Sequence, residues 1–198
     1  PVQHTYESMG DGATFFLPAW TDEQEITGPM AAKLFVSSET ADADLFLVVR
    51  LFSADMREVT FKGTLDPNTP LAQGWLRASH RKLDLEKSKP WQPWHPHDEI
   101  QPLVPGEIIE LDIEIWPTCI AVPPGYRIAL TIRGKDYENP WETTHKPSNM
   151  KNVFRGCGPF LHDDPEDRPL EIFDGKVTVH AGPDHPSYLL LPFVPPKE

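Results

Sequence analysis

The sequence predicts an all-β protein, a two-sheet antiparallel jelly-roll sandwich in which residues 1–198 form a single domain. Short apolar segments alternate with period two, 23 prolines and several turn signals separate them, and no stretch sustains a helical period. Proline lacks the N–H that a strand ladder needs, so prolines between apolar segments are typical of a loop-rich β domain. About nine short strands separated by turns favour a sandwich.

The expected strands differ in how clearly the sequence marks them. The clearest is residues 109–115, where four large apolar side chains alternate with three acidic ones, as in a half-buried strand. Residues 31–36, 45–52 and 188–193 are more continuously apolar, which indicates strands buried on both faces. Residues 128–132 and, over a shorter length, 176–180 also alternate with period two. The weaker candidates are residues 14–17, 58–61 and 75–78.

Turn signals lie between these segments, and two long segments show no regular pattern. The irregular segments are residues 83–103 and 134–170, and loops of this length usually cover or bind something. The turn signals are Gly28-Pro29, Asp66-Pro67-Asn68, Pro105-Gly106, Pro123-Pro124-Gly125 and Gly182-Pro183-Asp184.

Composition excludes several classes of partner. The formal net charge of -12 repels phosphate backbones, so we expect no nucleic acid partner. The longest unbroken apolar run, residues 45–49, is far short of the ~20 residues of a membrane span. Cys119 and Cys157 are too few for a disulfide framework and match no zinc spacing, which favours reduced thiols in a cytoplasmic protein. The alternative is a single disulfide in a secreted protein. No cofactor or metal is expected.

Ser8 is the residue to consider as a catalytic nucleophile. Residues 6–10 place Ser8 one residue short of the G-x-S-x-G nucleophile elbow. The elbow needs a strand before the serine and a helix after it, and neither is expected here. We therefore interpret Ser8 as a loop serine and expect no catalytic residue in this chain.

Three other groups have both a functional and a structural interpretation. His95, His97 and Asp98 resemble a metal or acid–base cluster, although solvated loop residues are the default. Asp42 and Asp44, and the acidic residues 163–167, could bind calcium or form solvated loops. Three tryptophans in the long loops could form a platform for sugar stacking, or could anchor those loops; they are Trp91, Trp94 and Trp141.

Six segments form a distinctive set from about residue 14 to the end of the chain: Glu25-Ile26-Thr27-Gly28-Pro29, Gly74-Trp75-Leu76-Arg77-Ala78-Ser79-His80-Arg81, Pro105-Gly106-Glu107, Glu114-Ile115-Trp116-Pro117-Thr118, Gly125-Tyr126-Arg127 and His180-Ala181-Gly182-Pro183-Asp184-His185-Pro186-Ser187. In their order and spacing, these segments resemble the C-terminal domain of the X-prolyl dipeptidyl-peptidase and cocaine esterase family. Within them we expect Trp116 to end a strand and cap the core. Arg77, His80 and Arg81 cluster on or just after a strand, and we expect them to pair with carboxylates such as Glu114.

The resemblance implies a galactose-binding-like jelly roll that follows an α/β-hydrolase domain, with residues 1–13 as a linker remnant of that missing domain. The family's catalytic triad lies in the hydrolase domain, so no catalytic residue is carried over. There are departures from the family pattern. Tyr126 stands where the family often has histidine, Asp55-Met56-Arg57 replaces the usual Asp-Gly hairpin, and residues 134–170 look elaborated.

The resemblance implies an accessory role: packing on the α/β-hydrolase domain of the same polypeptide, with a peptide or ester as the parent enzyme's substrate. The alternative is a stand-alone carbohydrate-binding sandwich. Several rings could form a docking face that the chain either exposes or hides by homo-oligomerisation, unless they fill its own core. They are Phe15, Phe16, Trp20, Trp91 and Trp94.

Overall fold

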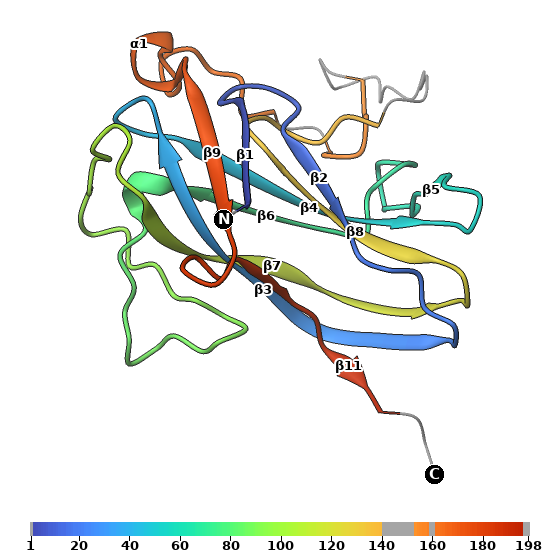
Figure 1. Cartoon of the computed structure of the whole chain (residues 1–198). Helices are drawn as coiled ribbons and strands as arrows, with labels where there is room; N and C mark the ends of the chain where they lie inside the picture. The colour runs from blue at the N-terminus through green and yellow to red at the C-terminus, as the bar shows by residue number, and fades with distance from the viewer. Residues whose placement is uncertain (1, 140–152, 159–160, 196–198) are drawn as a thin grey trace.

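The computed structural model describes residues 2–139, 153–158 and 161–195, which form two antiparallel sheets with little helix (Figure 1). The first sheet has the order β1-β9-β3-β10, with β7 and β11 also paired to β3; the second has the order β2-β8-β4-β5, with β6 paired to β4. The predicted mostly β, two-sheet antiparallel fold is confirmed. The strands are β1 (Val2–Glu7), β2 (Ala13–Phe16), β3 (Gln24–Ser38), β4 (Asp44–Phe52), β5 (Glu58–Val59), β6 (Ala72–Arg77), β7 (Ile109–Val122), β8 (Arg127–Arg133), β9 (Lys176–Ala181), β10 (Tyr188–Leu190) and β11 (Phe193–Val194).

The core is built from the alternating side chains of both sheets. On β7, Leu111, Ile113 and Ile115 are fully buried, and they pack in one apolar cluster with residues of β4 such as Leu47. The period read from residues 109–115 is therefore confirmed. Two short helical segments, a 3-10 turn at Ala78–His80 and α1 (Leu170–Phe173), occur in the described part of the chain. No helix there is long and apolar enough to cross a membrane.

The expected turn at Gly28-Pro29 is instead a bulge inside β3. The pairing of β3 with β7 shifts register between Gly28 and Met30, so Trp116 and Pro117 of β7 face the bulge. Proline is tolerated there because a bulge interrupts the hydrogen-bond ladder. Gly28 has φ +137°, which strongly favours glycine. The bulge explains why both strands run longer than their apolar patterns.

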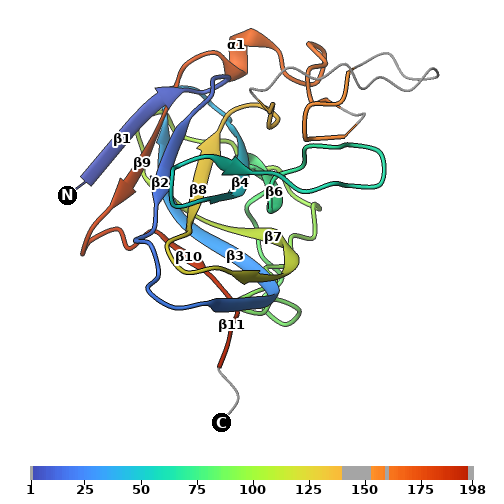
Figure 2. The ribbon, with the colours of Figure 1, turned by 90° about the vertical axis from the view of Figure 1, so that its right-hand side faces the viewer.

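The segment before residue 13 is part of the sheet, which corrects the expectation of a linker over residues 1–13. Val2–Glu7 pairs with β9 over its whole length, and only Tyr6 among these residues is buried. Both views show β1 beside β2 of the other sheet, where the rings of His4 and Phe15 meet edge to face at 5.9 Å (Figures 1 and 2). An edge strand with one buried side chain has no apolar alternation to detect.

The hairpin between β4 and β5 explains one departure from the family pattern. Met56 has φ +63°, a left-handed conformation that is uncommon for residues other than glycine. The backbone N–H groups of Met56 and Ser53 close the turn, each at 2.9 Å from a carbonyl oxygen. The hairpin therefore keeps a turn suited to glycine although methionine occupies it.

Candidate functional site

Ser8 cannot act as a nucleophile in this structure. Its side chain is buried, and its hydroxyl donates a hydrogen bond to the carbonyl oxygen of Phe173. A serine nucleophile needs an exposed Oγ beside a general base. The interpretation of Ser8 as non-catalytic agrees with this arrangement, although the residue is packed under α1 and is not a free loop residue.

Two residue pairs, one histidine–aspartate and one serine–histidine, each resemble part of a catalytic triad, and they lie at different places in the fold. His162 lies with Nδ1 at 2.9 Å from Asp136 Oδ1, and this hydrogen bond raises the pKa of His162. Ser37 on β3 lies with Oγ at 2.9 Å from Nε2 of His180 on β9. Burial, followed by the charge of His185, lowers the pKa of His180. Within the described ranges, these two pairs do not combine into a serine, histidine and aspartate set.

The acidic residues considered as calcium ligands have protein partners. Asp42 Oδ1 accepts the backbone N–H groups of Ala43 and Ser79, each at 2.9 Å. Asp44 pairs with Arg77 at 2.8 Å and with Arg168 at 2.9 Å. Both aspartates are buried, which corrects the default of a solvated loop. No group of three His, Cys, Asp or Glu side chains able to hold a metal occurs among the described residues.

In the acidic run at residues 163–167, some side chains are solvated and one forms an ion pair. Asp163, Asp164 and Glu166 are exposed, whereas Asp167 pairs with Arg77 at 2.9 Å. Arg77 therefore pairs with carboxylates as expected; they are Asp44 and Asp167, and Glu114, the example named from the sequence, is not one of its ion-pair partners. These charge-assisted hydrogen bonds tie β4 and β6 to the segment that follows β8.

The histidines of residues 80–97 form a small cluster beside β6. The Nδ1 atoms of His80 and His97 are 2.9 Å apart, and His97 has φ +55°. Burial, together with His80 and His95, lowers the pKa of His97. His95 has its two ring nitrogens at 3.1 and 2.9 Å from the carbonyl oxygens of Lys82 and Asp112, so it pins the loop to β7. Asp98 pairs with Lys82 at 3.0 Å, away from the imidazoles.

A close approach of β6 to β7 places two tryptophans together. A Cβ added at Gly74 would lie 2.1 Å from the carbonyl oxygen of Glu114, so only glycine permits this contact. The next residue, Trp75, meets Trp116 edge to face with ring centroids 5.1 Å apart. Trp116 is 62% exposed in the middle of β7, which corrects the expectation that it ends a strand and caps the core.

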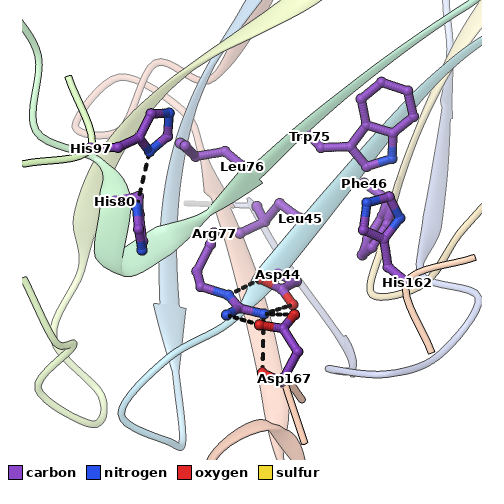
Figure 3. Close-up of a pocket in the computed structure, with 10 residues that line it drawn as sticks. All are labelled: Asp44, Leu45, Phe46, Trp75, Leu76, Arg77, His80, His97, His162 and Asp167. Atoms are coloured by element: carbon purple, nitrogen blue, oxygen red, sulfur yellow. Dashed lines mark hydrogen bonds and ion pairs between the residues drawn. The ribbon is translucent and has the colours of Figure 1, made fainter. Parts of the chain in front are cut away.

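A cavity of about 340 Å³ adjoins this junction. Figure 3 shows Trp75, Phe46 and His162 gathered on one side, with His80 and His97 on the other. Between them, Arg77 is held by Asp44 and Asp167. A second cavity of about 280 Å³ shares Trp75 and His97 with the first and adds Trp94 and Glu114. We call the two cavities together the Trp75 groove. The sequence analysis did not propose Trp75, Trp116 or His162 as site residues. Trp75 could have been suspected because it follows a glycine on a short strand.

The rings proposed for a docking face do not share one site. Trp91 lines a separate cavity with Leu190 and Pro192, while Trp94 lines the Trp75 groove. Trp20 is half-buried against the core, and its ring meets Phe193 at 5.9 Å. Trp141 lies outside the described residues. Cys119 and Cys157 are both unpaired thiols.

Phe15 and Phe16 line a third cavity, of about 280 Å³, between the edges of the two sheets. They are 38% and 45% exposed, and the buried core residues Leu34 and Ile132 lie among the other lining residues. Tyr188 and Leu189 of β10 complete one wall. We call this the Phe16 groove. It opens the apolar interior to solvent at one edge.

The fold and these contacts define a mostly β domain of two antiparallel sheets, in which the elbow-like Ser8 is buried and hydrogen-bonded to the backbone. The chain belongs to the family described as the X-Pro dipeptidyl-peptidase C-terminal non-catalytic domain, whose profile matches residues 2–190. The resemblance stated from the sequence is thereby confirmed.

Known relatives are longer proteins. The chain is 26% identical over 174 residues to the cocaine esterase of Rhodococcus sp.. The aligned region covers 88% of this chain and 24% of the esterase. A crystal structure of a CocE/NonD family hydrolase from Staphylococcus aureus superposes with TM-score 0.82 at 27% identity, over 98% of this chain and 33% of the hydrolase. An α-amino acid ester hydrolase, at 16% identity and TM-score 0.56, shares the fold alone. The chain thus spans a quarter to a third of the cocaine esterase and the staphylococcal hydrolase.

Proposed function

We propose that this domain packs on the α/β-hydrolase domain of a longer polypeptide and stabilises it. In that position it would also wall the substrate entrance of a serine hydrolase acting on a peptide or ester. The observation that carries the proposal is the match to a non-catalytic C-terminal domain along nearly the whole chain, within relatives about three times as long. The same observation favours an accessory domain over a stand-alone carbohydrate-binding module.

The Phe16 groove is the proposed docking face. Exposed large rings over a groove that reaches the core are unusual on a monomeric domain, and such sites receive apolar anchors of a partner. Phe16 is held in place by an edge-to-face contact with Phe52, with ring centroids 5.0 Å apart. Tyr188 on the opposite wall is also exposed. The groove thus has a preorganised apolar floor and two exposed walls.

The test is association with the upstream polypeptide encoded by the same gene, produced separately. We expect it to be about twice as long as this chain and to contain a G-x-S-x-G elbow. Calorimetry should detect binding that Phe16→Ser weakens by about tenfold or more. The matched control is Leu85→Ser, which changes an exposed apolar residue away from the groove and should leave binding unchanged.

Two outcomes would contradict the proposal: no association with the wild-type chain, or equal loss for the Phe16 and Leu85 variants. Self-association through the groove is a separate outcome, visible by analytical ultracentrifugation. If it disappears with Phe16→Ser while the upstream polypeptide does not bind, the occupant is a second copy, and the hydrolase-docking proposal fails.

We also propose that the connectivity is a galactose-binding-like jelly roll and that the protein works in a reducing, cytoplasmic compartment. The two sheets and the interleaved strand order support the first proposal. The two unpaired thiols, one of them exposed, support the second. Tracing the strand connections through the superposed staphylococcal structure tests the topology. Fractionation of the native cells tests the compartment.

A further inference from the structure

The Trp75 groove is distinct from the docking face and has the features of a ligand site. Its two cavities, of about 340 and 280 Å³, adjoin because they share Trp75, Leu76 and His97. Trp75 lines both cavities, and Trp94, which is 46% exposed, lines the second. The groove therefore offers two indole rings, and exposed Trp116 meets Trp75 edge to face from outside the lining. It shares no lining residue with the Phe16 groove.

The charges at the Arg77 end of the groove are mutually compensated. Arg77 lies between Asp44 and Asp167, with nitrogen–oxygen distances of 2.8 and 2.9 Å. Arg168 also pairs with Asp44, and His162 pairs with Asp136. Two guanidinium groups thus face two carboxylates. A charged ligand group at this end would have to displace one of these pairs, because burying an ion without a partner is costly.

Hydrogen-bonding capacity nevertheless remains at both ends. The Asp167 side chain is exposed and each of its oxygens has further lone pairs. The Nδ1 atom of His162 is engaged by Asp136, so its Nε2 is the nitrogen left for a ligand beside Trp75. Glu114 lines the opposite end. Carboxylate and imidazole groups flanking indole surfaces match a ligand with apolar faces and a rim of hydroxyl groups.

We propose that the Trp75 groove binds a neutral short oligosaccharide. The C–H face of a pyranose packs on an indole ring, and its hydroxyl groups bond to the carboxylates and to His162. The compensated charges favour a neutral sugar over a uronic acid or amino sugar. This activity would be a second function of the domain and is independent of docking at the Phe16 groove.

The chain offers a matched pair of tryptophans for the test. Trp94 lies in the groove and Trp91 lies outside it, and they are 46% and 47% exposed on the same loop. The 198-residue chain is titrated with a panel of neutral oligosaccharides, with uronic acid and amino sugar oligomers as charged probes. Binding is followed by calorimetry and by tryptophan fluorescence.

We expect saturable binding of at least one neutral oligosaccharide, weakened about tenfold by Trp94→Ala and changed less than about twofold by Trp91→Ala. Phe16→Ser should leave it unchanged, which separates this inference from the docking proposal. Trp75→Phe, a smaller ring that preserves packing, should also weaken binding. The inference is overturned if no neutral sugar binds, if charged sugars bind more tightly, if both tryptophan variants lose affinity equally, or if only an apolar peptide occupies the groove.

Discussion

Replacing Leu111 by alanine tests the packing of the two sheets. Leu111 is 0% exposed and lies directly opposite buried Leu34 of β3. The change removes three carbon atoms, whose transfer alone contributes about 2.4 kcal/mol at ~0.8 kcal/mol each. Paired strands limit how far the site can collapse, so a cavity term adds to this and the free energy of unfolding should fall by about 2–5 kcal/mol.

Glu110→Ala is the control on the same strand. Glu110 is on the solvent face and pairs with Lys33, which also pairs with Asp112 at 3.0 Å. Lys33 keeps a partner when Glu110 is removed, so the change should cost under about 0.5 kcal/mol. Equilibrium urea unfolding, followed by circular dichroism, measures both. Equal losses at the two positions would refute the assignment of inner and outer faces on β7.

Three further predictions follow from local contacts. Thiol titration of denatured, unreduced protein should count two thiols, Cys119 and Cys157, and a count of zero would contradict the unpaired state. Gly74→Ala should destabilise the fold by several kcal/mol, because its Cβ would meet a β7 carbonyl oxygen at 2.1 Å; unchanged urea stability would contradict that contact. The pKa of His162 is raised, so this residue stabilises the folded state below pH 6.5 and loses that contribution as the pH rises. The pKa of His97 is lowered, so this residue stabilises the folded state above pH 6.5 and loses that contribution as the pH falls. Urea unfolding at about pH 5 and about pH 8 should therefore show His162→Asn relatively worse at low pH and His97→Asn relatively worse at high pH; parallel profiles would contradict the opposite shifts.

The sequence pattern was informative where one face of a strand is buried. The alternation in residues 109–115 and 128–132 predicted β7 and β8 because a period of two is fixed by strand geometry. Strand limits were less accurate. Gly28-Pro29 carries the signature of a turn, yet the same residues form a bulge once β7 pairs across them. A turn and a β-bulge both favour glycine and proline, so the local sequence does not distinguish them. Only the pairing with a partner strand does.

The candidate sites were harder to predict than the fold because they depend on contacts between distant residues. The pairing of Arg77 with Asp44 and Asp167 joins residues that are 33 and 90 positions apart. Nothing in the spacing of Trp75 and Trp116 indicates that their rings touch; the close approach at Gly74 brings them together. The exposure of Phe16 could be expected only as one of two alternatives, docking face or core.

The measurement that tests the non-catalytic role most directly is labelling by a fluorophosphonate, which reacts with activated serines. The chain is incubated alone and together with the proposed upstream hydrolase polypeptide, and adducts are located by mass spectrometry. We predict no adduct on any serine of this chain, including Ser8, and one on the elbow serine that the proposal expects in the upstream polypeptide. A stoichiometric adduct on a serine of this chain would contradict the account.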